Sequence, residues 1–220
     1  MKITDEQLKQ AVLEELKWDL RVKETDVGVE VRSGVVTLTG TVESFAEKIA
    51  AQDAAHRVHG VYDVANDVRV RLPGSSERTD ADVARAVRDA LEWDVVVPDA
   101  QIRSTVSKGV VTLEGTVDTW TQFDDAARCI RNLKGVVEVR NLIEVVPATT
   151  SALAVRSAIE RALERHAQHA AHRIALEIVD GKVTLTGDVP TWSERRAVEG
   201  AVRGTVGVRE VENQLRVDVG

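Results

Sequence analysis

The chain of 220 residues has one cysteine, few aromatic residues and no long apolar run. Because Cys129 stands alone, neither an internal disulfide nor a cysteine-based zinc site can form. No stretch approaches the roughly 20 apolar residues of a membrane-spanning helix. The opening residues, MKITDEQLKQ, hold no apolar segment with a cleavage site. We therefore expect a soluble, cytoplasmic protein.

Basic residues are outnumbered by acidic ones, and this balance argues against nucleic acid as a partner. Hydrophobic residues make up 43% of the chain, charged residues 30%, and the net charge is −7. Such a composition is typical of folded globular domains. An acidic chain is a poor general binder of nucleic acid, which requires clustered Lys and Arg, so we expect no nucleic-acid partner.

What is present is a repeat. The stretch SGVVTLTGTVES at 33–44 returns as KGVVTLEGTVDT at 108–119 and as DGKVTLTGDVPT at 180–191. Gly34, Gly109 and Gly181 are therefore separated by 75 and 72 residues, and further matches keep these offsets. The repeat predicts three tandem units, at 1–72, 79–146 and 150–220.

Each repeated stretch is predicted to be the second strand of a hairpin. The glycine after Ser33, Lys108 or Asp180 can take the positive φ of a tight turn, and the flanking valines and leucines alternate with a period of two. The stretch ends in a hydroxyl with Glu or Gln three residues later, which predicts a capping box at Ser44, Thr119 and Thr191.

Two further elements complete the unit. A helix capped by Thr4, Thr79 or Ser151 precedes the hairpin, and a third strand follows Gly60, Gly135 or Gly207. A helical crossover usually returns the chain in parallel. We therefore predict an α+β protein of three αββαβ units, each a three-stranded mixed sheet with two helices on one face. The sequence leaves open whether the third strand pairs with the first or the second.

This pattern resembles the BON domain family, named for bacterial OsmY and nodulation proteins. The resemblance is carried by G-x-V-x-L-x-G, a helix and then G-V-x-x-V-x-N. Its residues here are Gly34, Gly40, Gly60 and Asn66; Gly109, Gly115, Gly135 and Asn141; and Gly181, Gly187, Gly207 and Asn213. It implies a non-enzymatic module associated with osmotic or envelope stress that binds anionic phospholipid. Some relatives bind potassium.

We interpret the signature residues as mainly structural. The first glycine of each motif makes the turn and the second permits a bulge or close approach, while the asparagines satisfy local backbone groups. A strand-like G-x-V-x-L-x-G is not a phosphate-binding loop. No nucleophile, paired carboxylates or metal set stands at a readable spacing, so we expect neither an enzyme nor a cofactor.

The scarce aromatic residues keep the repeat register. Trp18 and Trp93 end the first helices of two units, and Phe45, Trp120 and Trp192 follow the cap of each second helix. We expect these rings to close the small cores or to pack one unit on the next. The alternative is that Trp120 or Trp192 meets a membrane interface.

The third unit is the candidate for facing an anionic surface. The net charges of residues 1–72, 79–146 and 147–220 are −3, −4 and 0. The candidate lipid-facing residues are Arg165, Arg173, Arg195, Arg196 and Trp192. A weak metal candidate, His166, His169 and His172, is better interpreted as a pH-responsive basic patch. The functional expectation is binding to an anionic phospholipid surface, and the alternatives are a potassium-responsive protein or a protein scaffold.

Overall fold

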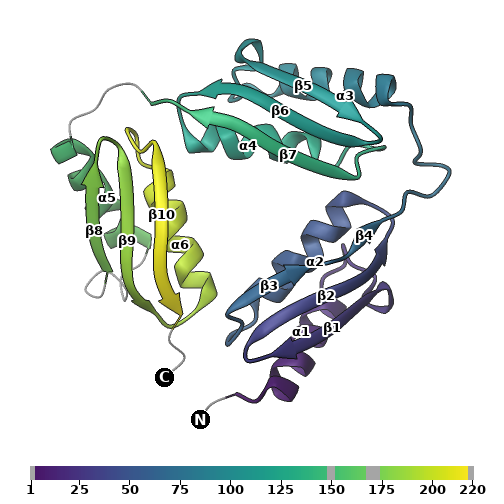
Figure 1. Ribbon diagram of the computed structural model, residues 1–220, viewed down its shortest axis with the longest axis horizontal. Coiled ribbons are helices and arrows are strands. Elements are labelled where there is room, and N and C mark those ends of the chain that lie inside the picture. The colour runs from purple at the N-terminus through teal and green to yellow at the C-terminus, as the bar shows by residue number, and fades with distance from the viewer. Residues whose placement is uncertain (1–2, 148–151, 167–173, 218–220) are drawn as a thin grey trace.

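The computed structural model describes residues 3–147, 152–166 and 174–217, except for the side chains of 152, 153 and 162–166. Its three units repeat the same order of elements (Figure 1). The first comprises α1 (Asp5–Trp18), β1 (Val27–Arg32), β2 (Val35–Val42), α2 (Phe45–Arg57), β3 (Asp63–Asn66) and β4 (Arg69–Val70). The second comprises α3 (Asp80–Trp93), β5 (Ile102–Ser107), β6 (Val110–Val117), α4 (Trp120–Ile130) and β7 (Glu138–Val145). The third comprises α5 (Ala152–His166), β8 (Ile174–Val179), β9 (Lys182–Val189), α6 (Trp192–Arg203) and β10 (Glu210–Val217). The predicted fold class is confirmed.

Each sheet has the second strand of its hairpin in the centre. The strand β6 pairs antiparallel with β5 and parallel with β7, and the same order recurs in the other two units. In the first unit the last strand is interrupted, so that β3 and β4 both pair with β2. The pairing that the sequence left open is thus with the second strand, and the parallel direction predicted for it is confirmed.

The hairpins close through two-residue turns. Val110 pairs with Ser107, which leaves Lys108 and Gly109 as the loop, with φ of 51° and 74°. Two positive φ angles in succession define a type I′ turn, whose twist matches that of the strands. The sequence predicted the positive φ of the glycine. It did not predict that Ser33, Lys108 and Asp180 also take this conformation.

The second glycine of each motif permits a close approach. Gly115 has a φ of 135°, and a Cβ atom built on it would lie 2.1 Å from the carbonyl oxygen of Gln101. A Cβ atom built on Gly40 would lie at the same distance from the carbonyl oxygen of Asp26. No side chain can be accommodated at such a contact, so the glycine is required where the second strand of the hairpin passes the residue before the first strand.

The capping prediction is partly wrong. Ser44, Thr119 and Thr191 each accept the N–H of the residue three positions on, but the reciprocal bond of a capping box is present at Thr119 alone among these three. Glu47 instead accepts the N–H groups of Lys23 and Glu43, at 3.0 and 3.1 Å. Thr4 and Thr79 cap the first helices as predicted, and Ser151 lies outside the described residues.

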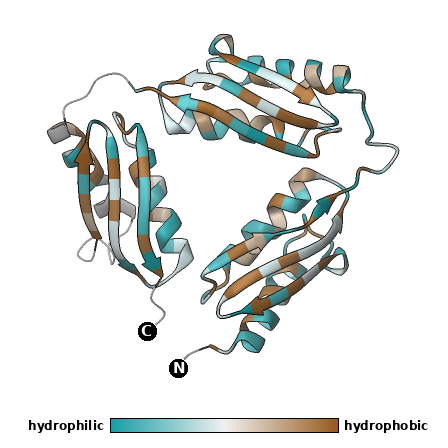
Figure 2. Cartoon of the chain, viewed as in Figure 1, coloured by the Kyte–Doolittle hydropathy of each residue, from teal (hydrophilic) through white to brown (hydrophobic). Residues whose placement is uncertain are grey.

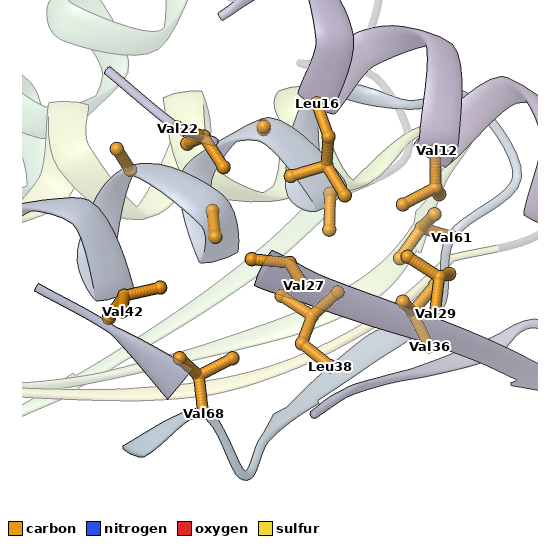
Figure 3. Packing of buried hydrophobic residues seen from close by; sticks show 14 of the residues in the cluster. Val12, Leu16, Val22, Val27, Val29, Val36, Leu38, Val42, Val61 and Val68 are labelled. Carbon is orange, nitrogen blue, oxygen red and sulfur yellow. The ribbon is translucent and has the colours of Figure 1, made fainter. Parts of the chain in front are cut away.

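Each unit has its own apolar core between its sheet and its helices. In the first unit, side chains of α1 such as Val12 and Leu16 meet Val36 and Leu38 of the central strand, and all four are buried (Figure 3). Figure 2 shows apolar and polar residues alternating along the strands. Fully burying a side chain of this size contributes about 1.5–3 kcal/mol, so burial of one sheet face and two helix stripes holds each unit together.

The units close into a ring through one repeated position. Figure 1 shows α2, α4 and α6 directed toward the middle of a triangle. At the first residue of these helices, Phe45 joins the core of the second unit and Trp120 packs against the core of the third. Trp192 stacks on His56 of the first unit, with ring centroids 4.7 Å apart. Each unit therefore contacts both others, in the cyclic order first, second, third, first.

Candidate functional site

The family-signature asparagines tie the last strand to the second helix. Asn141 donates to the carbonyl oxygen of Phe123 at 2.8 Å and accepts the N–H of Ile143 at 3.3 Å. Asn66 repeats both kinds of bond, while Asn213 donates to a glutamate of α6. These contacts are internal to each unit, as the structural interpretation of the signature expected.

The hairpin turns of the first two units are each held by an aspartate that the sequence patterns did not indicate. Asp80, at the start of α3, accepts the N–H groups of Lys108 and Gly109, at 2.8 and 2.9 Å. These two bonds lower the pKa of its carboxyl. Asp5 holds the turn of the first unit in the same way. The third unit has Ala152 at the matching position, so its sequence lacks this anchor.

The basic residues of the third unit are largely engaged within the chain. Arg195 donates to the carbonyl oxygens of Leu215 and Asn213, both at 3.0 Å. Its guanidinium also stands 4.8 Å from the ring of Trp192. The contacts of Arg195 and Trp192 argue against the lipid-facing role expected for them. Arg165, Arg173, His166, His169 and His172 fall outside the described side chains.

The ring contact between the first and third units is closed by a second pair. Arg196 reaches Asp53 at 3.4 Å across a sequence separation of 143 residues. Next to it His56 is 9% exposed, and its Nε2 atom is buried with no partner among the described residues. Burial and the nearby Arg196 lower the pKa of His56, so the neutral imidazole suits this interface.

Trp18 and Trp93 contradict the expectation that every aromatic ring closes a core or packs one unit on the next. Their residues are 81% and 86% exposed, and the loops that follow expose Leu20 at 99% and Val95 at 100%. A positional signal existed, because Trp18 lies two residues, or about 200° around the helix, beyond the buried Leu16. The first two units thus each present an aromatic and an aliphatic side chain at one loop.

The two loops differ in charge. Residues 17–23, KWDLRVK, hold three basic residues and one acidic residue, and we call them the basic tip. Residues 92–98, EWDVVVP, hold two acidic residues and no basic one, and we call them the acidic tip. The third unit has RHAQ in the register of Trp93 to Val96 and so lacks the tryptophan.

The one carboxylate of the basic tip is paired with two arginines. Asp19 accepts from Arg21 at 2.7 Å and from Arg57 of α2 at 2.9 Å. The bonds from Arg21 and then Arg57 hold the pKa of Asp19 far below its usual range, despite the opposing effect of burial. Its side chain is only 7% exposed, so the surface of the tip is formed by Trp18, Leu20 and the three basic side chains.

A cavity of about 480 Å³ lies where the three units meet. Ile49 of α2, Asp124 of α4 and Arg196 of α6, which share one repeat position, all line it. Arg131 and Phe45 line it as well. Equivalent helix positions therefore face one another across the middle of the ring, but carry different chemistry in each unit.

The described residues hold no cluster of metal-ligating side chains. Across residues 3–147, 154–161 and 174–217, whose side chains are described, no three His, Cys, Asp or Glu gather as metal ligands would. Burial raises the pKa of the Cys129 thiol to about 11, which fits the predicted role as a small apolar side chain of α4. None of the described helices could span a membrane.

Comparison with known proteins gives the same threefold division. The model of the BON domain matches residues 4–71, 79–147 and 151–219. The chain is 36% identical to osmotically-inducible protein Y of Escherichia coli (strain K12) over 124 residues, which are 54% of this chain and 62% of that protein. The match thus spans less than two thirds of that relative.

Two further similarities are more distant. A 21 kDa hemolysin of Actinobacillus pleuropneumoniae is 26% identical over 147 residues, covering 66% of this chain and 75% of that protein. Among solved structures, the C-terminal domain of CdsD, a structural protein of the type III secretion system of Chlamydia trachomatis, aligns with 98% of this chain and all of that chain. Its identity is 16% and its TM-score 0.25.

Proposed function

Because the chain belongs to the BON domain family, we propose that it is a non-enzymatic, osmotic-stress-related protein that binds peripherally to an anionic phospholipid surface. The stress role is supported by the similarity to osmotically-inducible protein Y. The observation that carries the lipid role is the basic tip of the first unit, where Trp18 and Leu20 are exposed beside three basic residues.

The side chains of the basic tip suit a lipid headgroup region. Tryptophan is enriched at membrane interfaces because its ring is amphipathic, and burying a leucine contributes about 1.5–3 kcal/mol. Each Lys or Arg close to an anionic surface adds about 1 kcal/mol. Lys17 is exposed. Arg21 forms an ion pair with Asp19, and Lys23 forms one with Glu43. The electrostatic contribution to lipid binding is therefore smaller than that of three unpaired charges.

The acidic tip provides a matched control within the same molecule. It exposes Trp93 and Val95 as fully as the basic tip exposes its apolar side chains. Its charge, however, would be repelled by anionic lipid, since Glu92 and Asp94 flank the tryptophan. Comparing the two tips therefore separates the contribution of charge from that of exposed apolar surface.

The test is co-sedimentation of the full chain with vesicles of phosphatidylglycerol and phosphatidylcholine, against phosphatidylcholine alone. Trp18→Ala and Lys17→Glu should each weaken binding to the anionic vesicles, Trp18→Ala by at least tenfold. Trp93→Ala and Lys134→Glu, which change an equally exposed tryptophan and an exposed lysine elsewhere, should alter it less than twofold. Equal losses for Trp18→Ala and Trp93→Ala, or no binding by the unaltered chain, would contradict the proposal.

A further inference from the structure

The cavity between the three units contains one unpaired group of each charge. Among the described residues of its wall, Arg203 pairs with Glu199 at 2.7 Å, and Glu199 also accepts from Asn213. Arg128 pairs with Asp125 at 2.8 Å, and Arg196 with Asp53. The charges of these three arginines are therefore matched by carboxylates.

Arg131 and Asp124 differ from these neighbours. Neither side chain forms a hydrogen bond or an ion pair with any residue in the described part of the chain. Asp124 lies at the exposed rim of the cavity. The surrounding protein nevertheless withdraws enough water from its carboxyl to raise its pKa, against the opposing pull of Arg203 and Arg128. The wall thus presents an unpaired cation and an unpaired, partly desolvated anion.

The spacing of these two groups sets the size of a ligand. Both belong to the same helical stretch, seven residues apart, which is about 10 Å along a helix axis. A ligand that reaches both side chains through charge-assisted hydrogen bonds must therefore carry its two charged groups several bonds apart. Phe45, Ile49 and Val139 supply apolar surface to the wall of the same cavity. A volume of about 480 Å³ lies within the usual range of small-molecule sites.

We propose that this cavity binds a small zwitterion, whose anionic group is held by Arg131 and whose ammonium group is held by Asp124. The intervening methylene groups lie against Phe45, Ile49 and Val139. Because all three units contribute to the wall, the ligand is recognised only when the ring is closed. This site is separate from the basic tip, and its occupation does not depend on lipid.

The test is calorimetric titration of the full chain, without lipid, with a ruler of ω-amino acids: glycine, 4-aminobutyrate and 8-aminooctanoate. We expect 4-aminobutyrate to bind at least tenfold more tightly than glycine, and also than butyrate or butylamine, which lack one charge. Binding of the ammonium group should also lower the pKa of Asp124, measured by NMR. Butyrate binding as tightly as 4-aminobutyrate would overturn the proposal.

Two variants and their controls assign the contacts. Asp124→Asn and Arg131→Gln should each weaken 4-aminobutyrate binding at least tenfold, whereas the exposed Asp89→Asn and Lys134→Gln of the same unit should leave it unchanged. The headgroup of phosphatidylethanolamine shares this charge pattern. Glycerophosphoethanolamine binding more tightly than 4-aminobutyrate would support the zwitterion site with a lipid source. Unchanged binding by both cavity variants would overturn the proposal.

Discussion

Replacing Trp192 with alanine should open the ring without unfolding any unit. Trp192 is the first residue of α6, and its stack on His56 is a principal contact between the third and first units. The cap of α6 at Thr191 uses a different side chain and stays intact. The substitution therefore removes the contact between units while leaving the local structure of the helix.

The cost of this change can be worked from the contact. Truncating a fully buried tryptophan costs about 3–5 kcal/mol, and an aromatic stack contributes about 0.5–1.5 kcal/mol beyond its buried area. Because Trp192 is only half-buried, we expect a loss of about 2 kcal/mol, or a shift of roughly thirtyfold toward the open arrangement. The exposed pair of Arg196 and Asp53 contributes at most about 1 kcal/mol, too little to compensate.

The assay is X-ray scattering in solution, with circular dichroism as the check on folding. Trp192→Ala should raise the maximum dimension and the radius of gyration while the circular dichroism spectrum is unchanged. The control is Trp93→Ala, because that residue is 86% exposed and is not a member of the core clusters of the described residues. A compact scattering curve for Trp192→Ala, indistinguishable from the control, would refute the role assigned to this ring.

Three further predictions concern the turns and the His56 contact. Gly109→Val should destabilise the second unit by about 3 kcal/mol or more, since a positive φ and a contact of 2.6 Å with the Gly135 carbonyl oxygen are both unfavourable. Gly181→Val, where the nearest contact of the added Cβ atom is 3.1 Å, should destabilise its unit less in the same thermal melt. A larger loss for Gly181→Val than for Gly109→Val would contradict this reasoning. Asp80→Asn should weaken the second unit in urea. Because the pKa of Asp80 is lowered in the folded state, the difference from the unaltered chain should be full above its ordinary value of 3.8 and vanish as pH falls below it. The pKa of His56 is also lowered, by burial and Arg196 and against the opposing effect of Asp53 and Asp63. The open ring therefore binds the proton more readily, and closure should weaken as pH falls below the ordinary value of 6.5. His56→Phe should remove that dependence.

The local features of each unit could be predicted because neighbouring residues determine them. Gly109 between two runs of β-branched residues indicates a turn, Thr119 indicates a helix cap, and alternating valines indicate a strand. The partner of the third strand could not be predicted, since alternation reports which face is buried but not which edge is paired. Ring closure was also hidden, because it depends on contacts such as that between Arg196 and Asp53, which lie far apart in the sequence.

The candidate site, too, could be predicted from the sequence only in part. Net charge favours the third unit as the lipid-facing part. It does not show that the Arg195 guanidinium donates its hydrogen bonds to backbone carbonyl oxygens of the same unit. The basic tip escapes the sequence prediction because Trp18, at a helix end, is expected to belong to a core. Its angle of about 200° from Leu16 around the helix indicated the opposite face, and this signal was present in the sequence.

The central claim, that the basic tip meets the lipid, is tested most directly by the fluorescence of Trp18 alone. In a variant with Trp93, Trp120 and Trp192 all changed to phenylalanine, anionic vesicles should shift the emission of Trp18 to shorter wavelength and protect it from acrylamide. A matched variant that retains only Trp93 should show neither change. Emission of Trp18 that is unaltered by anionic vesicles under conditions where the chain co-sediments with them would contradict the account.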